Sequence, residues 1–120
     1  MGYSVDAAEA RRDQALIQYK QAVANAFADV RNALSAQESA RKILASESSR
    51  SDALAQAYKQ ADLRYRAGIA SRLELLDIER NYLQAQLNRL DAERAQRSAI
   101  ADLFNALGGG WNKQDVAKAP

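Results

Sequence analysis

One tyrosine and two carboxylates near the middle of the chain, Tyr65, Glu74 and Asp77, are of the types that can support chemistry. Carboxylates transfer protons, bind cations or create a negative potential. The sequence of 120 residues has no histidine and no cysteine, which excludes histidine-based acid–base catalysis, cysteine nucleophiles and the usual zinc sites. A glycine run, Gly108–Gly110, follows a helical pattern, the wrong context for a phosphate-binding loop. From the sequence we therefore expect that the protein is not an enzyme and that it has no catalytic residue, no cofactor and no metal site.

The charged residues are balanced, with 17 Lys and Arg against 15 Asp and Glu and a net charge of +2. They alternate in sign along the chain, which is typical of a solvated surface with ion pairs and argues against a nucleic-acid partner. No apolar run approaches the roughly 20 residues that span a bilayer, so this chain is not expected to cross a membrane itself.

The elements that must position these residues meet at a short break, Gly68-Ile69-Ala70-Ser71. Gly68 suits the left-handed residue that closes a helix. Ser71, three residues before Glu74, forms a capping-box pattern that starts a second helix. A connection this short predicts two antiparallel helices with their tip at Gly68–Ser71.

Helix-breaking residues are almost absent from the rest of the chain, and the composition favours helix. We expect a first helix over residues 6–67, a second over 72–107, and a glycine-rich end with a polar tail over 108–120. Large apolar residues recur in steps of three and four, as in a coiled coil. The prediction is an all-α fold, a long antiparallel helical hairpin with unequal arms.

The apolar pattern is wider than a two-helix contact requires. The second helix carries two neighbouring apolar stripes, and Arg94 and Arg97 interrupt the longer one. The first stripe is Leu73, Leu76, Leu83, Leu87 and Leu90, and the second is Leu75, Ile78 and Tyr82. Surplus apolar surface predicts association with copies of the chain or with further helices.

The segment 46–52, SESSRSD, is the least helical by propensity, and we expect either a helix held by packing or a flexing point.

Three motifs carry a resemblance to a known family: YRAG at 65–68, LLD at 75–77 and ALGGGW at 106–111. In this order and spacing they resemble the second helical hairpin of the TolC-like outer-membrane efflux proteins. The resemblance covers residues 7–112. It implies a trimeric channel of Gram-negative bacteria with a β-barrel in the outer membrane and a periplasmic α-barrel, of which this chain is one part. It also implies a periplasmic adaptor protein and an inner-membrane pump as partners.

The resemblance also assigns roles to residues at the tip. Tyr65 matches a tyrosine that holds the closed gate, and Glu74 and Asp77 match an acidic ring at the pore entrance. The tip turn, which adaptors contact in the family, corresponds to Gly68, Ile69, Ala70, Ser71 and Arg72. Ala70 departs from members that carry an arginine in the gate, so the gate bonds are not carried over here.

Simpler explanations compete with these roles. Glu74 can serve as the capping partner of Ser71, and Asp77 lies where negative charge favours a helix N-terminus. Tyr65 fits coiled-coil packing. An arginine-rich face is most often solvated, and Trp111 is either a packing anchor or part of a loose tail. The arginines of that face are Arg80, Arg89, Arg94 and Arg97.

Two other functions stay open at this point. The first is the helical hairpin of a periplasmic adaptor, against which the unequal arms argue. The second is a purely structural coiled coil, which predicts a continuous contact without interruptions at Arg41, Ser48 and Arg94. The hairpin could also open at Gly68 and pair with a second copy in a swapped arrangement.

Overall fold

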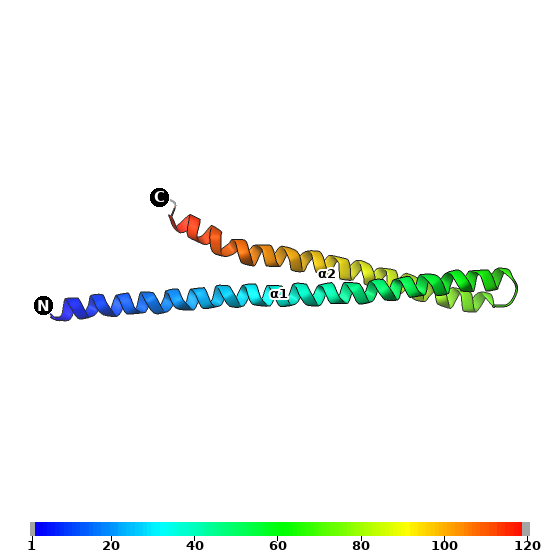
Figure 1. Cartoon of the computed structure of the whole chain (residues 1–120), viewed down its shortest axis with the longest axis horizontal. Coiled ribbons are helices and arrows are strands. Elements are labelled where there is room, and N and C mark those ends of the chain that lie inside the picture. The colour runs from blue at the N-terminus through cyan, green and yellow to red at the C-terminus, as the bar shows by residue number, and fades with distance from the viewer. Residues whose placement is uncertain (1, 119–120) are drawn as a thin grey trace. The chain divides into compact units, whose positions relative to one another are not determined.

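The computed structural model describes residues 2–118, and side chains as far as residue 108. Within that range the chain forms two helices and no strand, α1 (Gly2–Arg66) and α2 (Arg72–Lys118) (Figure 1). The all-α prediction is confirmed. The chain divides into two compact units, Ser35–Ala101 and Met1–Leu34 with Asp102–Pro120. The first unit contains the turn and both helix segments beside it, so it is the antiparallel hairpin itself.

The C-terminal end of α2 differs from the sequence prediction. We expected the second helix to end at Leu107, before the glycine run, whereas α2 continues to Lys118. Glycine costs a helix about 1 kcal/mol relative to alanine, but no steric clash excludes it, and proline is absent before residue 120. A run of three glycines therefore weakens a helix without ending it. Trp111 lies outside the residues whose side chains are described.

The segment 46–52, with its low helix propensity, lies inside α1 without interruption. Ser51 explains how it is held, because only 4% of this residue is exposed. A serine is small enough for a second helix to approach closely at that position, so packing outweighs the weak local preference. Of the two alternatives, a helix held by packing is the one observed.

We call the contact between the two helices of unit Ser35–Ala101 the inner seam. Its residues recur in steps of three and four on both helices and are all buried or half-buried. On α1 they are Gln37, Ala40, Leu44, Glu47, Ser51, Leu54, Tyr58, Ala61 and Tyr65. On α2 they are Leu75, Ile78, Tyr82, Ala85, Arg89, Ala92, Gln96 and Ala99. This continuous heptad pattern is that of an antiparallel coiled coil.

The most deeply buried residues of the seam are small. The residues under 9% exposed are Ala40, Ser51, Ala61, Ala85, Ala92 and Ala99. Small side chains let helix backbones approach closely and gain contact along their length. Near the tip the seam also holds an aromatic pair, since the rings of Tyr58 and Tyr82 stack with centroids 5.9 Å apart.

The longer apolar stripe predicted on α2 lies outside the inner seam. Leu76, Leu83, Leu87 and Leu90 are 47%, 52%, 56% and 49% exposed. Arg41 and Arg94, which we expected to interrupt a helix contact, are also exposed. The alanines and the shorter stripe make the hairpin, so the leucines are left for another partner.

Candidate functional site

The turn at the hairpin tip is closed by backbone hydrogen bonds around Gly68. The amide of Gly68 donates to the carbonyl of Tyr65 at 3.0 Å, and the amide of Ile69 donates to the carbonyl of Arg64 at 2.9 Å. Gly68 has a φ of 78°, the left-handed conformation that only glycine adopts without strain. This residue thus ends α1 and turns the chain toward α2.

Ser71 starts α2. Its Oγ accepts a hydrogen bond from the backbone amide of Glu74 at 3.2 Å, and its carbonyl accepts one from the amide of Leu75, also at 3.2 Å. Among the described contacts the Glu74 carboxylate makes no return bond to the Ser71 amide, so half of the predicted capping box is formed. The Glu74 side chain is left exposed and available for another role.

The tip presents apolar side chains to solvent. Ile69 and Leu73 are each 71% exposed, and Arg72 lies exposed between them in the sequence. Ala70 is half-buried. Exposed branched side chains on a rigid turn are a common basis for a protein–protein contact.

Glu74 and Asp77 lie on one face of α2 together with further polar residues. Asp77 forms a loose ion pair with Arg80, at 3.7 Å between Oδ1 and Nη2, and both side chains are largely exposed. Along the same face the Gln84 amide donates to Asn88 Oδ1 at 3.1 Å. We call this face the polar stripe: Glu74, Asp77, Asn81, Gln84, Asn88 and Asp91. The polar stripe contains three carboxylates and no Lys or Arg, so its negative potential attracts cations and its polar groups interact well with water.

The structure separates Tyr65 from the carboxylates. Tyr65 is half-buried at the tip end of the inner seam, whereas Glu74 and Asp77 are exposed on the polar stripe. Among the described residues no three acidic groups lie close enough to hold a metal ion. The candidate site therefore consists of an exposed turn and a charged surface.

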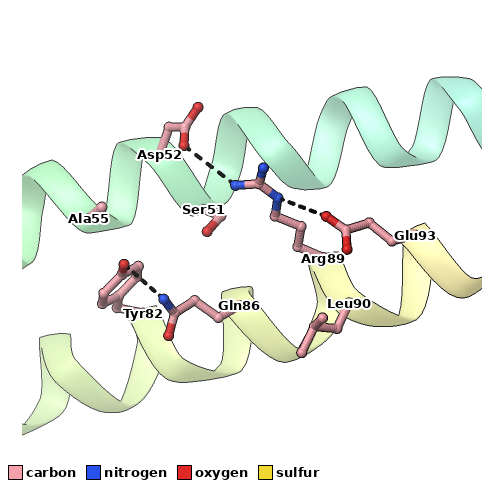
Figure 2. Close-up of a pocket in the computed structure, with 8 residues that line it drawn as sticks. All are labelled: Ser51, Asp52, Ala55, Tyr82, Gln86, Arg89, Leu90 and Glu93. Atoms are coloured by element: carbon pink, nitrogen blue, oxygen red, sulfur yellow. Dashed lines mark hydrogen bonds and ion pairs between the residues drawn. The ribbon is translucent and has the colours of Figure 1, made fainter.

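Arg89 is the residue that sequence reasoning placed wrongly. We expected it on a solvated face, but it lies on the inner seam and reaches toward α1 (Figure 2). Its guanidinium pairs with Asp52 at 3.8 Å and with Glu93 at 3.4 Å. Counting heptads from Tyr82 would have placed residue 89 on the seam.

Arg89 borders an open cavity of about 350 Å³ on the flank of the hairpin. The lining residues in Figure 2 are Ser51, Asp52, Ala55, Tyr82, Gln86, Arg89, Leu90 and Glu93. One seam position before Ser51, the Oε2 atom of Glu47 is buried without a hydrogen-bond partner. Polar groups therefore interrupt the apolar contact at this level of the seam.

None of the described helical segments combines the length and the hydrophobicity that crossing a membrane requires.

Comparison with known proteins identifies a family. A family model described as "Outer membrane efflux protein" matches residues 3–109. No solved structure matches the chain significantly.

Three relatives illustrate the similarity. Outer membrane protein OprJ of Pseudomonas aeruginosa is 33% identical over 106 residues, 88% of this chain and 22% of that protein. Cation efflux system protein CusC of Escherichia coli is 32% identical over 110 residues, 92% of this chain and 24% of CusC. Pyoverdine export outer membrane protein OpmQ of Pseudomonas putida is 35% identical over 104 residues, 87% of this chain and 22% of OpmQ. The chain spans less than a quarter of the length of each.

Proposed function

Because the chain belongs to the outer membrane efflux protein family, we propose that its hairpin forms part of the periplasmic tunnel wall of an efflux channel. In this role the hairpin conducts nothing alone. It contributes one wall segment and one tip to a trimer, and the tunnel forms when three subunits assemble. The family is one of export proteins, so no catalytic role is proposed.

One observation carries this proposal: α2 has three chemically different faces. The inner seam is covered by α1. The exposed leucines require neighbouring helices to bury them, whereas the polar stripe can face water. A helix in the wall of a water-filled tunnel requires this arrangement, with packing on its sides and polar groups toward the lumen. A free two-helix coiled coil has no use for the exposed leucines.

The polar stripe gives the tunnel its electrostatic character. Three copies of Glu74 and of Asp77 near the entrance would place two carboxylate rings around the lumen. Rings of carboxylates attract cations and repel anions. Within one chain Arg80 neutralises Asp77 only weakly, because the pair is long and exposed, so most of the negative potential persists.

The tip is proposed as the docking point for a periplasmic adaptor that connects the channel to an inner-membrane pump. Ile69 and Leu73 supply the apolar contact, and the turn at Gly68 and the cap at Ser71 keep them in place. The sequence alone left open that this chain is the hairpin of an adaptor protein. Both the family match and the unequal helices, 65 and 47 residues, favour the channel.

A chimera tests the lumen assignment. This chain would replace the 106 matched residues of OprJ in a cysteine-free background, with single cysteines introduced at Gln84 on the polar stripe or at Leu83 beside it. We expect a bulky membrane-impermeant thiol reagent to modify Gln84→Cys and block export, while Leu83→Cys stays protected by neighbouring helices. Equal modification of both positions would refute the lumen assignment.

Deleting Gly68–Ser71 in the same chimera tests the tip. Export should fall to the level of cells without the channel, while the trimer still assembles and is inserted. Retention of export would show that docking occurs elsewhere.

A further inference from the structure

The exposed leucines of α2 continue into exposed arginines along one line, which we call the outer stripe. Its members recur in steps of three and four and are all exposed: Leu73, Leu76, Arg80, Leu83, Leu87, Leu90, Arg94 and Arg97. Within the described part of the chain, neither Arg94 nor Arg97 forms an ion pair. The stripe is therefore mainly leucine as far as Leu90, with an interruption at Arg80, which pairs with Asp77, and it is cationic at Arg94 and Arg97.

A second copy of the chain is a poor occupant of this stripe. If two outer stripes paired in parallel, Arg80, Arg94 and Arg97 would each face their own counterparts. If they paired antiparallel with Leu83 opposite Leu87, so that stripe members face stripe members, Arg94 would lie against Leu76 and Arg97 against Leu73 of the other copy. Like charges opposite each other select against the parallel pairing, and guanidinium groups desolvated against leucine select against the antiparallel pairing.

We infer that the outer stripe binds a helix of unlike sequence, one with an apolar heptad stripe that ends in carboxylates opposite Arg94 and Arg97. The leucines provide the buried area, and the arginines select the partner and its direction. The inference rests on the proposed function in one respect: the partner would be another wall helix of the channel.

The arrangement also limits how the partner can slide. Moving the partner by one heptad would keep most leucines against leucines but would leave Arg94 and Arg97 opposite apolar residues. A charged group desolvated against an apolar one is unfavourable. The outer stripe therefore specifies one register, which an all-leucine stripe would not do.

The test uses the 120-residue chain and two synthetic amphipathic helices about four heptads long. Both peptides carry the same leucine stripe, with a glutamine at the position opposite Arg80. They differ only in the last two stripe positions, which are glutamate in one and lysine in the other. Affinity is measured by fluorescence anisotropy at low and at physiological salt. We expect the glutamate peptide to bind roughly tenfold more tightly, as two partly exposed charge pairs allow, with a smaller difference at higher salt.

Two variants provide the controls. The double substitution Arg94→Glu and Arg97→Glu should reverse the preference, so that the lysine peptide binds more tightly. Arg50→Glu, an exposed substitution on α1 away from the stripe, should leave the preference unchanged. Circular dichroism checks that each variant remains helical.

Light scattering gives an independent result without a peptide. Leu83→Asp should leave the mass of the chain in solution unchanged, because the outer stripe does not bind a second copy. The inference is overturned if the two peptides bind equally, if neither binds, or if Leu83→Asp dissociates a dimer. None of these outcomes depends on export, so failure here is distinguishable from failure of the lumen or docking assignments.

Discussion

The inner seam has two lengths that share one heptad pattern but differ in chemistry. The tip length, residues 54–65 with 75–85, contains leucine, isoleucine and three tyrosines. The far length, residues 37–51 with 89–99, contains alanines, Ser51, Glu47 and the Arg89 ion pairs. Both lengths keep the same heptad spacing along the contact, so the difference between them lies in the residues at those positions and in how strongly these hold the helices together. We expect the tip length, with its larger apolar side chains, to contribute more to the stability of the hairpin, whereas the far length accommodates polar groups.

The largest expected effect comes from enlarging a buried alanine in the tip length. Ala85 is 1% exposed, and Tyr82 precedes it by one seam position. Ala85→Leu has no room, and we expect it to lower the free energy of unfolding by about 3 kcal/mol, the upper end for an overpacked core. Urea unfolding followed by circular dichroism measures the loss.

The same substitution in the far length sharpens the comparison. Ala92 is 5% exposed and lies at the level of small or polar seam residues. Ala92→Leu should cost about 1 kcal/mol or less, because the added apolar surface compensates part of the crowding. Ala95→Leu, exposed on α2, is the matched control and should change little. Equal losses at residues 85 and 92 would contradict the division of the seam.

The next effect concerns the aromatic pair. Tyr58 and Tyr82 stack at 5.9 Å with an interplanar angle of 27°, and Gln86 Nε2 donates to Tyr82 Oη at 2.8 Å. Both tyrosines are half-buried, so Tyr82→Ala should cost about 2 kcal/mol, less than the 3–5 kcal/mol of a fully buried aromatic.

A double-mutant cycle with Tyr58→Ala isolates the pair itself. The coupling should be about 0.5–1.5 kcal/mol, the range measured for stacked aromatic rings. Additive losses would mean that each ring packs on other groups and that the stack contributes nothing of its own.

Features of the fold that depend on local residues could be predicted from the sequence, whereas features that depend on the contact between the two helices could not. The turn could be predicted because Gly68 and Ser71 act locally, through a left-handed φ and a side-chain cap. The helix count followed from the absence of breakers. The choice between the two apolar stripes could not be predicted, since a leucine buries more apolar area than an alanine and so favours the leucine stripe as the contact. The close approach that small residues allow becomes visible only when both helices are placed.

Two further outcomes show the limits of local reasoning. The end of α2 was mistaken because glycine is a weak breaker whose effect depends on the surrounding helix. Arg89 was mistaken because a charged residue on a seam is uncommon unless a partner is near, and Asp52 comes from the other helix. The roles of Tyr65, Glu74 and Asp77 stay predictions, because they depend on the assembled channel.

Replacing Arg89 tests whether the far length contributes register more than stability. The side chain is 42% exposed and pairs with Asp52 and Glu93. Arg89→Leu fills the seam with apolar surface and loses two long ion pairs, so we expect a gain of about 0.5–1 kcal/mol. Without this polar layer the helices should also slide or associate more readily, which light scattering detects as a higher mass. A loss of stability beyond about 1 kcal/mol would instead make Arg89 a major stabilising residue.

The smallest expected effect is electrostatic and lies on the exposed flank of the far length. Arg41 donates to both carboxylate oxygens of Glu38, at 2.6 Å and 3.2 Å. This hydrogen bonding, aided by the charges of Arg41 and Lys42, lowers the pKa of Glu38. A carboxylate whose pKa is lower in the folded state stabilises the fold above its unfolded pKa. That contribution disappears as the pH falls through the folded pKa.

The Glu38→Gln variant should therefore have a slightly lower melting temperature than the parent at neutral pH. The two melting temperatures should become equal once the pH is low enough to protonate Glu38. Salt should narrow the neutral-pH difference, because both side chains are about half exposed. Arg41→Gln should reproduce the neutral-pH loss, and adding it to Glu38→Gln should cost little more. Parallel melting curves for parent and variant from neutral to acid pH would mean that the pair contributes nothing. In that case the packing of the inner seam, and not this exposed pair, would hold the hairpin closed at this level.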